Sequence, residues 1–242
     1  MFDWFSKKKI FTSSPLQVDM HSHLLPGIDD GVQSLEDAEA IILYFKKLGY
    51  TKLITTPHVM SDSYPNTPEI IHEKLRTLQA HLQQKNIVIT IQAAAEYYLD
   101  EAFTAMVESD KPLLTFGSKH LLFETNFLTE PFNMKEVLFQ IMTKGYKPIL
   151  AHPERYLYLQ DNLKKAEDLI DRGVLFQINI SSITGYYSPA VQRTARQLID
   201  RGWVHLLGSD CHHMQHARLI EEAFKQKHFQ KAVTLSLLNN TL

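Results

Sequence analysis

The chain has 242 residues, which is enough for one barrel-sized domain or two small ones, and a core of that size needs no disulfide or structural metal. Hydrophobic residues make up 44% and charged residues 21%, as is usual for globular proteins. The formal net charge of −2, with both signs mixed along the chain, argues against a nucleic-acid partner.

The cysteine and hydropathy patterns favour a cytoplasmic protein. Cys211 is the single cysteine, so no intramolecular disulfide can form, and no run of about eighteen apolar residues predicts a transmembrane segment. Residues 1–15 are expected to form an N-terminal extension, and residues 16–242 a single domain. The extension lacks the apolar stretch of a secretory signal. Its aromatic residues beside Lys7, Lys8 and Lys9 predict at most weak peripheral contact with a membrane.

Strand and helix patterns alternate along the domain. Short apolar runs predict seven strands, the first from Val18 and the others within residues 52–58, 87–95, 120–124, 148–155, 175–180 and 204–212. Apolar residues at helical spacing, with capping residues before them, predict helices near residues 34–49, 67–82, 100–108, 133–145, 162–172, 188–202, 216–226 and 229–238.

Glycines at the helix ends support this alternation. Gly49, Gly145, Gly173 and Gly202 each follow a predicted helix and precede an apolar strand within a few residues. A glycine there supplies the left-handed cap, and the short link is typical of an αβ unit. Alternating strands and helices imply parallel strands joined by crossovers. Seven such units favour a closed, TIM-like (β/α)7 barrel, with an open α/β sheet as the alternative.

Polar residues gather where the predicted strands end. Eight His, Asp or Glu side chains occupy these positions: His21, His23, His58, Glu96, Glu124, His152, Asp210 and His212. If the first strand persists through them, His21 and His23 point to the same face, because strand side chains alternate. Asp30 follows in the first loop. In a parallel barrel the carboxyl ends of the strands share one rim, so these residues are expected to meet.

Such a set of ligands indicates a metal centre. Imidazole and carboxylate without thiolate suit manganese, iron or zinc, and the set is too large for one ion, so we expect two or three. Paired ions bridged by carboxylates are typical of phosphoester hydrolysis. The alternative is a buried ion-pair network without metal. It is less favourable, because burying many ionisable groups together without a compensating charge costs free energy. The other histidines are interpreted as structural or surface residues: His72, His81, His120, His205, His213, His216 and His228.

A cysteine-dependent phosphatase does not fit the sequence. That mechanism needs a Cys-x5-Arg loop, and the sixth residue after Cys211 is Ala217, with Arg218 one position late. Glycine-rich phosphate-binding loops are also absent from the sequence. We therefore interpret Cys211 as a bystander between two predicted ligands.

Six motifs in a fixed order carry a family resemblance. They are His21-Ser-His23 followed by Asp29-Asp30-Gly31, Thr56-Pro57-His58, the strand ends at Glu96 and Glu124, His152-Pro-Glu-Arg155-Tyr156, and Ser209-Asp210-Cys-His212. From Leu16 to the end, the chain resembles the polymerase and histidinol phosphatase (PHP) family. More closely, it resembles that family's manganese-dependent protein-tyrosine phosphatases from bacterial capsule and exopolysaccharide operons.

The resemblance implies a distorted seven-stranded (β/α) barrel with a trinuclear manganese site that hydrolyses phosphotyrosine on proteins. It implies that the eight strand-end residues are metal ligands, and that Asp30 is a ligand or an acid/base partner. Arg155 matches the family's phosphate-orienting arginine, whose planar fork can hold two phosphoryl oxygens. Metal-activated hydroxide would attack phosphorus. A bacterial tyrosine autokinase is the implied partner.

Two departures and two rival functions stay open. The chain has an extension before Leu16, and Val59 follows His58 where relatives often have a second histidine, so the number of ions is less certain than metal binding. A small-molecule phosphatase such as a histidinol phosphatase is the nearer rival, because the metal core does not define the leaving group. A non-catalytic metal-binding regulator of a kinase is the second. Tyrosines interpreted as exposed hint at stacking on a substrate ring: Tyr97, Tyr98, Tyr186 and Tyr187.

Overall fold

A computed structural model describes residues 11–109 and 111–242 of the chain. The membrane contact predicted for Lys7, Lys8 and Lys9 lies outside the described residues. Among the helices that the structure describes, none combines the length and the apolar character needed to cross a bilayer.

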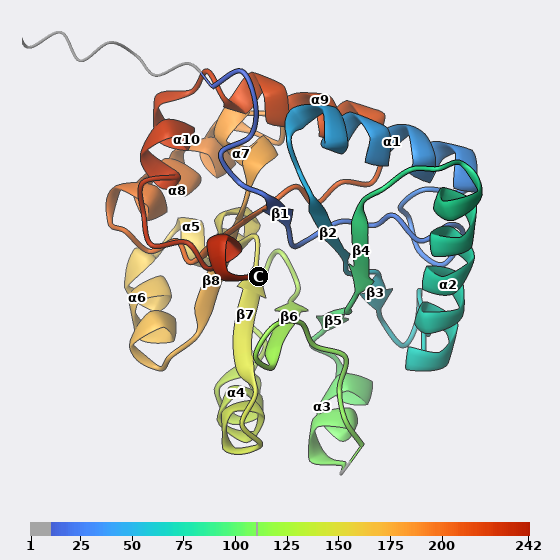
Figure 1. Cartoon of the computed structure of the whole chain (residues 1–242). Helices are drawn as coiled ribbons and strands as arrows, with labels where there is room; N and C mark the ends of the chain where they lie inside the picture. Colours follow the sequence, from blue (N-terminus) through green and yellow to red (C-terminus); the bar gives the residue numbers. More distant parts are fainter. Residues whose placement is uncertain (1–10, 110) are drawn as a thin grey trace, which may run out of the picture.

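The strands form two all-parallel sheets in the described part of the chain (Figure 1). The smaller sheet has the order β1 (Val18–Asp19), β2 (Lys52–Thr55), β4 (Thr90–Ala93). The larger has the order β3 (His58–Val59), β5 (Glu96–Tyr98), β6 (His120–Glu124), β7 (Lys147–Ala151), β8 (Leu175–Asn179), β9 (Leu206–Gly208). The predicted α/β fold with parallel strands is confirmed.

Two of the seven predicted strands differ from the structure. The predicted strand 52–58 is divided into β2 and β3 before His58, because Pro57 has no N–H to donate to a ladder. Within the predicted strand 87–95 only β4 forms, and a separate strand, β5, begins just beyond it at Glu96. Backbone bonds still join the two sheets there, since Ala94 N donates to Thr55 O at 2.9 Å and Glu96 N to Pro57 O at 3.0 Å.

Side chains rather than a strand ladder join β1 to β9. Asn239 bonds to Val18 O and to both backbone groups of Leu207. Further along, Ser209 donates from both N and Oγ to the Asp19 carboxylate, each at 2.8 Å. A single bridge pairs Ser22 with Cys211 beyond the strand ends. We call this contact between the first and last strands the β1–β9 seam.

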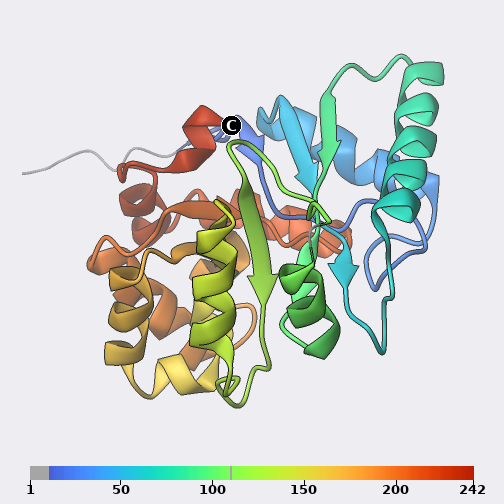
Figure 2. The same ribbon diagram turned by 90° about the horizontal axis from the view of Figure 1, so that it is seen from below.

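Helices surround the strands on their outer side (Figures 1 and 2). They are α1 (Leu35–Leu48), α2 (Pro68–Gln84), α3 (Glu101–Glu108), α4 (Met134–Thr143), α5 (Leu157–Gln160), α6 (Leu163–Asp171), α7 (Ile180–Thr184), α8 (Pro189–Asp200), α9 (Met214–Ala223) and α10 (Lys227–Ala232), with 3-10 turns η1 (Pro153–Arg155) and η2 (Leu238–Thr241). The first helix begins where predicted, because the Ser34 side chain accepts a hydrogen bond from Asp37 N. The short helices α5 and α7 and both 3-10 turns were not predicted.

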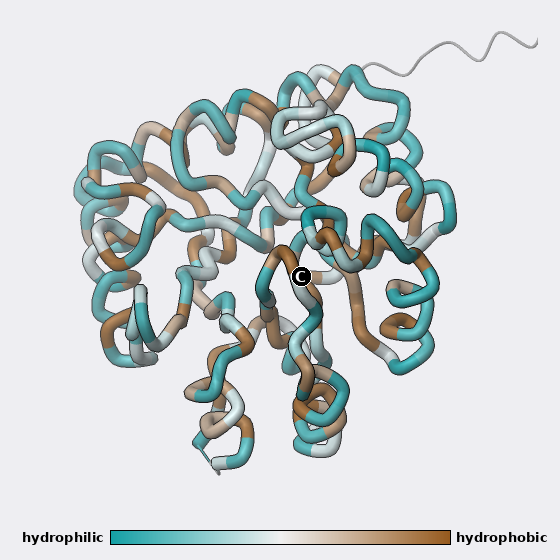
Figure 3. The backbone as a smooth tube through the Cα atoms, turned by 180° about the vertical axis from the view of Figure 1, so that it is seen from behind, coloured by the Kyte–Doolittle hydropathy of each residue, from teal (hydrophilic) through white to brown (hydrophobic). Residues whose placement is uncertain are grey.

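The core has an outer and an inner part. Figure 3 shows hydrophobic residues along the strands and hydrophilic residues on the outer turns of the helices. The large cluster fills the space between strands and helices, whereas a smaller cluster lies among the strands themselves. Val18, Ile54, Leu122, Ile149 and Leu206 of the smaller cluster come from strands of both sheets. Strands of both sheets therefore contribute to one shared apolar cluster.

Candidate metal centre

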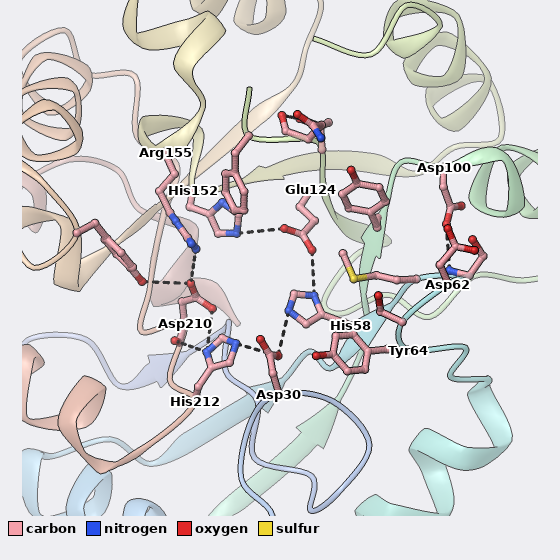
Figure 4. A pocket seen from close by; sticks show the side chains of 18 of the residues that line it. Asp30, His58, Asp62, Tyr64, Asp100, Glu124, His152, Arg155, Asp210 and His212 are labelled. Carbon is pink, nitrogen blue, oxygen red and sulfur yellow. Dashed lines mark hydrogen bonds and ion pairs between the residues drawn. The ribbon is translucent and has the colours of Figure 1, made fainter. Parts of the chain in front are cut away.

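All ten residues singled out in the sequence lie at one end of the strands, where seven of them line a cavity of about 730 Å³ and His21, His23 and Glu96 are buried beside it (Figure 4). They occupy the loops after β1, β7 and β9, the first residues of β3 and β5, the last residue of β6, the end of η1 and the loop before α1. In Figure 4, Glu124, His152, Arg155, Asp210, His212, Asp30 and His58 surround a common centre.

His21 and His23 face each other through their Nε2 atoms, which lie 3.4 Å apart. Strand β1 ends at Asp19, so hydrogen bonds rather than strand alternation set these rings. His21 Nδ1 lies 2.8 Å from Gln177 Oε1, and His23 Nδ1 lies 2.8 Å from Asp29 Oδ2. With both Nδ1 atoms donating, the two Nε2 atoms converge, and either a proton or a metal ion between them relieves the repulsion of their lone pairs.

Glu96 is fully buried, and its carboxylate lies close to four histidines of the site. Its Oε2 lies 3.2 Å from His21 Nε2, 3.4 Å from His23 Nε2 and 3.2 Å from His58 Nδ1, and its Oε1 lies 3.1 Å from His152 Nε2. Burial raises the pKa of this carboxyl, but His21 and His58 lower it more, so the net pKa is well below the usual value. The carboxylate stays charged and concentrates negative potential where the imidazoles meet.

The same charges act on His21. Burial lowers its pKa, but Glu96 and Asp210 raise it, and the net pKa is about 9. Without a metal ion, the site therefore holds protons to balance its carboxylates. A divalent cation can replace them, and metal binding would then release protons.

Buried polar atoms without hydrogen-bond partners test whether a metal fits. His58 Nδ1 and Glu124 Oε1 lie 3.0 Å apart, yet neither makes a hydrogen bond of acceptable geometry within the described residues, and the same holds for His152 Nδ1. An unpaired buried polar atom is costly, so several at one site indicate a missing partner. Nitrogen and oxygen ligands without sulfur suit Mn²⁺, Fe²⁺ or Zn²⁺.

Asp30 stands on the cavity side of the cluster. Its Oδ1 lies 3.4 Å from both His58 Nε2 and His212 Nε2, and its side chain is half exposed. Burial raises its pKa, but the hydrogen bond and charge of His212 and the charge of His58 lower it to about 2. Asp30 is therefore an ionised carboxylate with the contacts of a ligand.

Three overlapping groups of ligand atoms each span less than 4.8 Å within the described residues. They are His23, Asp30, His58 and His212; His21, His23 and Glu96; and His58, Glu96 and Glu124. His23, His58 and Glu96 each occur in two groups, as expected of ligands shared between neighbouring ions. His152 and Asp210 lie outside these groups but contact them.

Asp210 connects the ligands to Arg155. Its Oδ1 lies 3.4 Å from both His21 and His23, while its Oδ2 accepts from Arg155 Nη1 at 3.2 Å and from Asn179 at 2.7 Å. The Arg155 guanidinium lies 4.5 Å from the ring centroids of both Phe127 and Tyr187. These cation–π contacts help to hold the guanidinium at the cavity wall beside the proposed ligands.

Several residues of the site were not predicted. Gln177 and Asn179 lie two apart on β8, and Gln177 Nε2 donates to Asn179 Oδ1 at 2.9 Å, which links His21 to Asp210. Their signal was visible as alternating polar residues in an otherwise apolar strand. Asp29, which orients His23, stood beside Asp30 in the same motif.

One interpretation is wrong: Tyr97, expected to be exposed, is buried, and its hydroxyl accepts from Leu114 N. His216, interpreted as structural or surface, is buried, lines the cavity and lies 3.2 Å from Asp210 O through Nδ1. Tyr98 and Tyr187 do line the cavity.

The position of Cys211 agrees with its interpretation as a bystander. The thiol is fully buried, and burial raises its pKa far above the usual value. A buried thiol of that kind is a poor nucleophile at neutral pH.

Comparisons with known proteins match this geometry. CpsB of Streptococcus pneumoniae, a tyrosine-protein phosphatase, is 28% identical over 81% of this chain and 83% of its own length. YwqE of Bacillus subtilis, also a tyrosine-protein phosphatase, is 25% identical over 82% of this chain and 78% of its own. CapC of Staphylococcus aureus is 28% identical over 81% of this chain and 76% of its own.

Solved structures are similar over most of the chain. A crystal structure from a study of YwqE and CpsB, described as unique metal-dependent tyrosine phosphatases, has a TM-score of 0.76 at 25% identity over 90% of this chain and 85% of that one. An amidohydrolase from Mycoplasma synoviae has a TM-score of 0.56 at 11% identity over 94% of this chain and 87% of that one, a likeness of fold alone. The sequence model of the capsular polysaccharide synthesis family CpsB/CapC matches residues 17–238. The chain therefore belongs to the CpsB/CapC family.

Proposed function

We propose that the chain is a metal-dependent phosphatase that hydrolyses phosphotyrosine on proteins. The observation that carries this proposal is the position of Arg155, which lies on the cavity wall with its guanidinium 3.2 Å from Asp210, beside the group of histidines and carboxylates. Family membership and two relatives that are tyrosine-protein phosphatases support the same function.

We propose eight residues, together with Asp30, as the ligands of two or three divalent ions: His21, His23, His58, Glu96, Glu124, His152, Asp210 and His212. Mn²⁺ is the proposed ion, because hard carboxylate oxygens and imidazoles without thiolate suit it. When bound at such a site, divalent ions lower the pKa of a water molecule to near neutrality and neutralise phosphoryl oxygens.

The chain's own residues would then hold and orient the substrate. Arg155 presents two N–H groups that can bind two phosphoryl oxygens at once. Tyr64, whose ring stacks on His58 at 5.6 Å and 14°, and Phe127 provide apolar faces for a phenyl ring. The half-exposed Asp30 is the carboxylate of the ligand set that stands nearest to the open cavity.

The proposed substrate is a phosphorylated tyrosine kinase of a bacterial capsule or exopolysaccharide system. The family's role in capsular polysaccharide synthesis supports this setting. We also propose that the two sheets are halves of one distorted (β/α)7 barrel. The shared apolar cluster and the β1–β9 seam support closure.

The test compares phosphate release from a phosphotyrosyl peptide with release from histidinol phosphate, first with manganese and then with a chelator. We expect manganese-dependent preference for the peptide. Preference for histidinol phosphate would assign the chain to metabolite hydrolysis, and no release from either would contradict the proposal. An Asp210→Ala variant purified in parallel controls for contaminating phosphatases, because its activity should be lost.

A further inference from the structure

The loop between β6 and α4, residues 125–133, presents apolar side chains to solvent beside the cavity. Phe132 is fully exposed, at 107% of its reference area, and Leu128 is 66% exposed. Leu157, at the start of α5, is 44% exposed and adjoins the loop, because its N donates to Phe127 O at 2.8 Å. Adjacent exposed apolar side chains of this size commonly mark a binding surface.

The loop is held in this conformation by polar contacts at its base. The Asn126 side chain accepts from Leu128 N at 2.8 Å and from Thr129 N at 3.2 Å. Glu130 pairs with Lys165 of α6 at 2.7 Å. These contacts fix the loop with Leu128 and Phe132 exposed, and a preorganised apolar surface binds with less loss of conformational entropy.

The exposed loop is continuous with the catalytic cavity. The Phe127 ring lines the cavity and contacts Arg155, and residues 128–132 line a neighbouring groove of about 480 Å³. The two lysines of this groove are paired, Lys165 with Glu130 and Lys135 with Asp168 at 2.9 Å. A polypeptide whose phosphorylated side chain reaches Arg155 would therefore pass over a groove in which the exposed apolar side chains of Leu128 and Phe132 stand beside paired charges.

We infer that Leu128, Phe132 and Leu157 form a docking surface for the polypeptide segment next to the phosphotyrosine, and that this surface selects apolar side chains there. The inference rests on the proposed function, since it takes its occupant from the substrate of the cavity. An extended segment places every second side chain on one face, so flanking apolar residues can enter the groove while the phosphotyrosine enters the cavity.

The experiment uses the manganese-loaded full chain and three substrates. These are p-nitrophenyl phosphate, a phosphotyrosyl peptide with leucines on both sides of the phosphotyrosine, and the same peptide with serines there. For a Leu128→Ser/Phe132→Ser variant, we expect kcat/KM on the leucine peptide to fall about tenfold, the loss from one exposed apolar contact of about 1.4 kcal/mol. Activity on the other two substrates should stay the same.

Phe139→Ser is the matched control, because Phe139 is 70% exposed on α4 and lines neither the cavity nor the groove. Equal losses on all substrates, or an equal loss in the control, would overturn the inference. An unchanged kcat/KM in the double variant would also overturn the inference if the variant lost another kind of binding. Loss of binding to anionic vesicles would assign the surface to a membrane, and loss of self-association would assign it to a second copy of the chain.

Binding of the fluorescently labelled leucine peptide, measured by anisotropy, keeps this test independent of turnover. The double variant should bind it about tenfold more weakly than the wild type. If the wild type hydrolyses no substrate but shows this difference, the proposed function fails and the docking surface stands. If it hydrolyses all three substrates and the variant binds the peptide normally, the docking surface fails alone.

Discussion

Two of the proposed ligands, His152 and Asp210, have a left-handed backbone, with φ of 36° and 49°. Residues other than glycine rarely adopt this conformation, which costs about 1 kcal/mol or more. Neighbouring groups hold it in place, since His152 N donates to Gln177 Oε1 at 3.3 Å and Asp210 N to His21 O at 2.8 Å. Strain of this kind is typical of functional sites, and here it directs both side chains toward Glu96 and the histidines.

A substitution at Gly208 should weaken metal binding without removing a ligand. A Cβ there would lie 2.8 Å from His21 Cβ and 2.8 Å from Gln177 Nε2. Gly208→Ala must therefore displace His21 or Gln177 and disturb the hydrogen bond between them that orients the His21 ring. We expect metal affinity to fall about 10- to 100-fold, as measured by calorimetric titration with Mn²⁺.

Gly145→Ala is the control for this substitution. Gly145 has a φ of +78°, and a Cβ there would meet only Lys119 Nζ, at 3.7 Å. We expect this variant to lose about 1 kcal/mol of stability and to bind metal normally. Unchanged affinity in Gly208→Ala would refute the role given to the His21–Gln177 pair.

Most residues of the site could be predicted because they lie in a motif at the end of a predicted strand. The residues that orient them by hydrogen bonds could not be predicted. Gln177 and Asn179 meet His21 and Asp210 only through the register of β8 with β9, which no local pattern encodes. His216 reaches the cavity because α9 begins directly after the last ligand loop.

At the scale of elements, the β1–β9 seam depends on the side chain of Asn239 in η2. Its Oδ1 accepts from Leu207 N at 2.9 Å, and its Nδ2 donates to Leu207 O at 2.8 Å and to Val18 O at 3.1 Å. One buried amide therefore satisfies three backbone groups that a strand ladder would otherwise pair.

Asn239→Ala should destabilise the protein by about 3 kcal/mol, because these three buried backbone groups lose their partner. Urea unfolding followed by circular dichroism measures the loss. The neighbouring Asn240 is exposed, so Asn240→Ala should change the free energy of unfolding by less than about 0.5 kcal/mol. Similar midpoints for the two variants would show that the seam does not rely on Asn239.

The long helices and the strands marked by an apolar run were predictable, whereas other short elements were not. Helix α1 buries the apolar residues that its periodicity indicated, among them Ile41, Ile42 and Phe45. The elements β3, α5, α7 and η2 depend on contacts between distant segments, and their runs of two to five residues carry too little periodicity to identify them. The predicted strand 175–180 ends one residue early because Ile180 begins α7.

For the whole molecule, metal binding should stabilise the fold. The proposed ligands come from segments between His21 and His212, which are brought together only in the folded chain. An ion that binds this state alone, at a concentration about 100 times its dissociation constant, should add about 2.7 kcal/mol. Thermal unfolding with Mn²⁺ and with chelator tests this, and equal midpoints would contradict a preformed centre.

The free energy of unfolding should also decrease at acidic pH, because the folded chain holds His205 in its neutral form. Burial lowers its pKa below 6.5, and its Nδ1 accepts a hydrogen bond from Phe176 N at 3.0 Å, so the folded state keeps it neutral. The unfolded chain takes up a proton below about pH 6.5, so this contribution is present above that pH and is lost as pH falls toward the folded pKa.

A His205→Asn variant keeps an acceptor but does not titrate. Between about pH 7.5 and about pH 5 it should lose less stability than the wild type, as measured by urea unfolding in the presence of chelator. Taking the difference between the two proteins cancels the contributions of the other histidines, including His21, His23 and His58, whose raised pKa values act with the opposite sign. Parallel pH profiles would exclude His205 as the acid-sensitive group.

The β1–β9 seam also sets the order of events during synthesis. Ser209 and Asp210 are translated about 190 residues after Asp19 and His21, which they contact, and Asn239 about 220 residues after Val18. The proposed ligand set is therefore incomplete until Asp210 and His212, which follow the last strand, have been synthesised. If these residues hold the ions, a chain that stops before β9 should bind metal more weakly than the full chain.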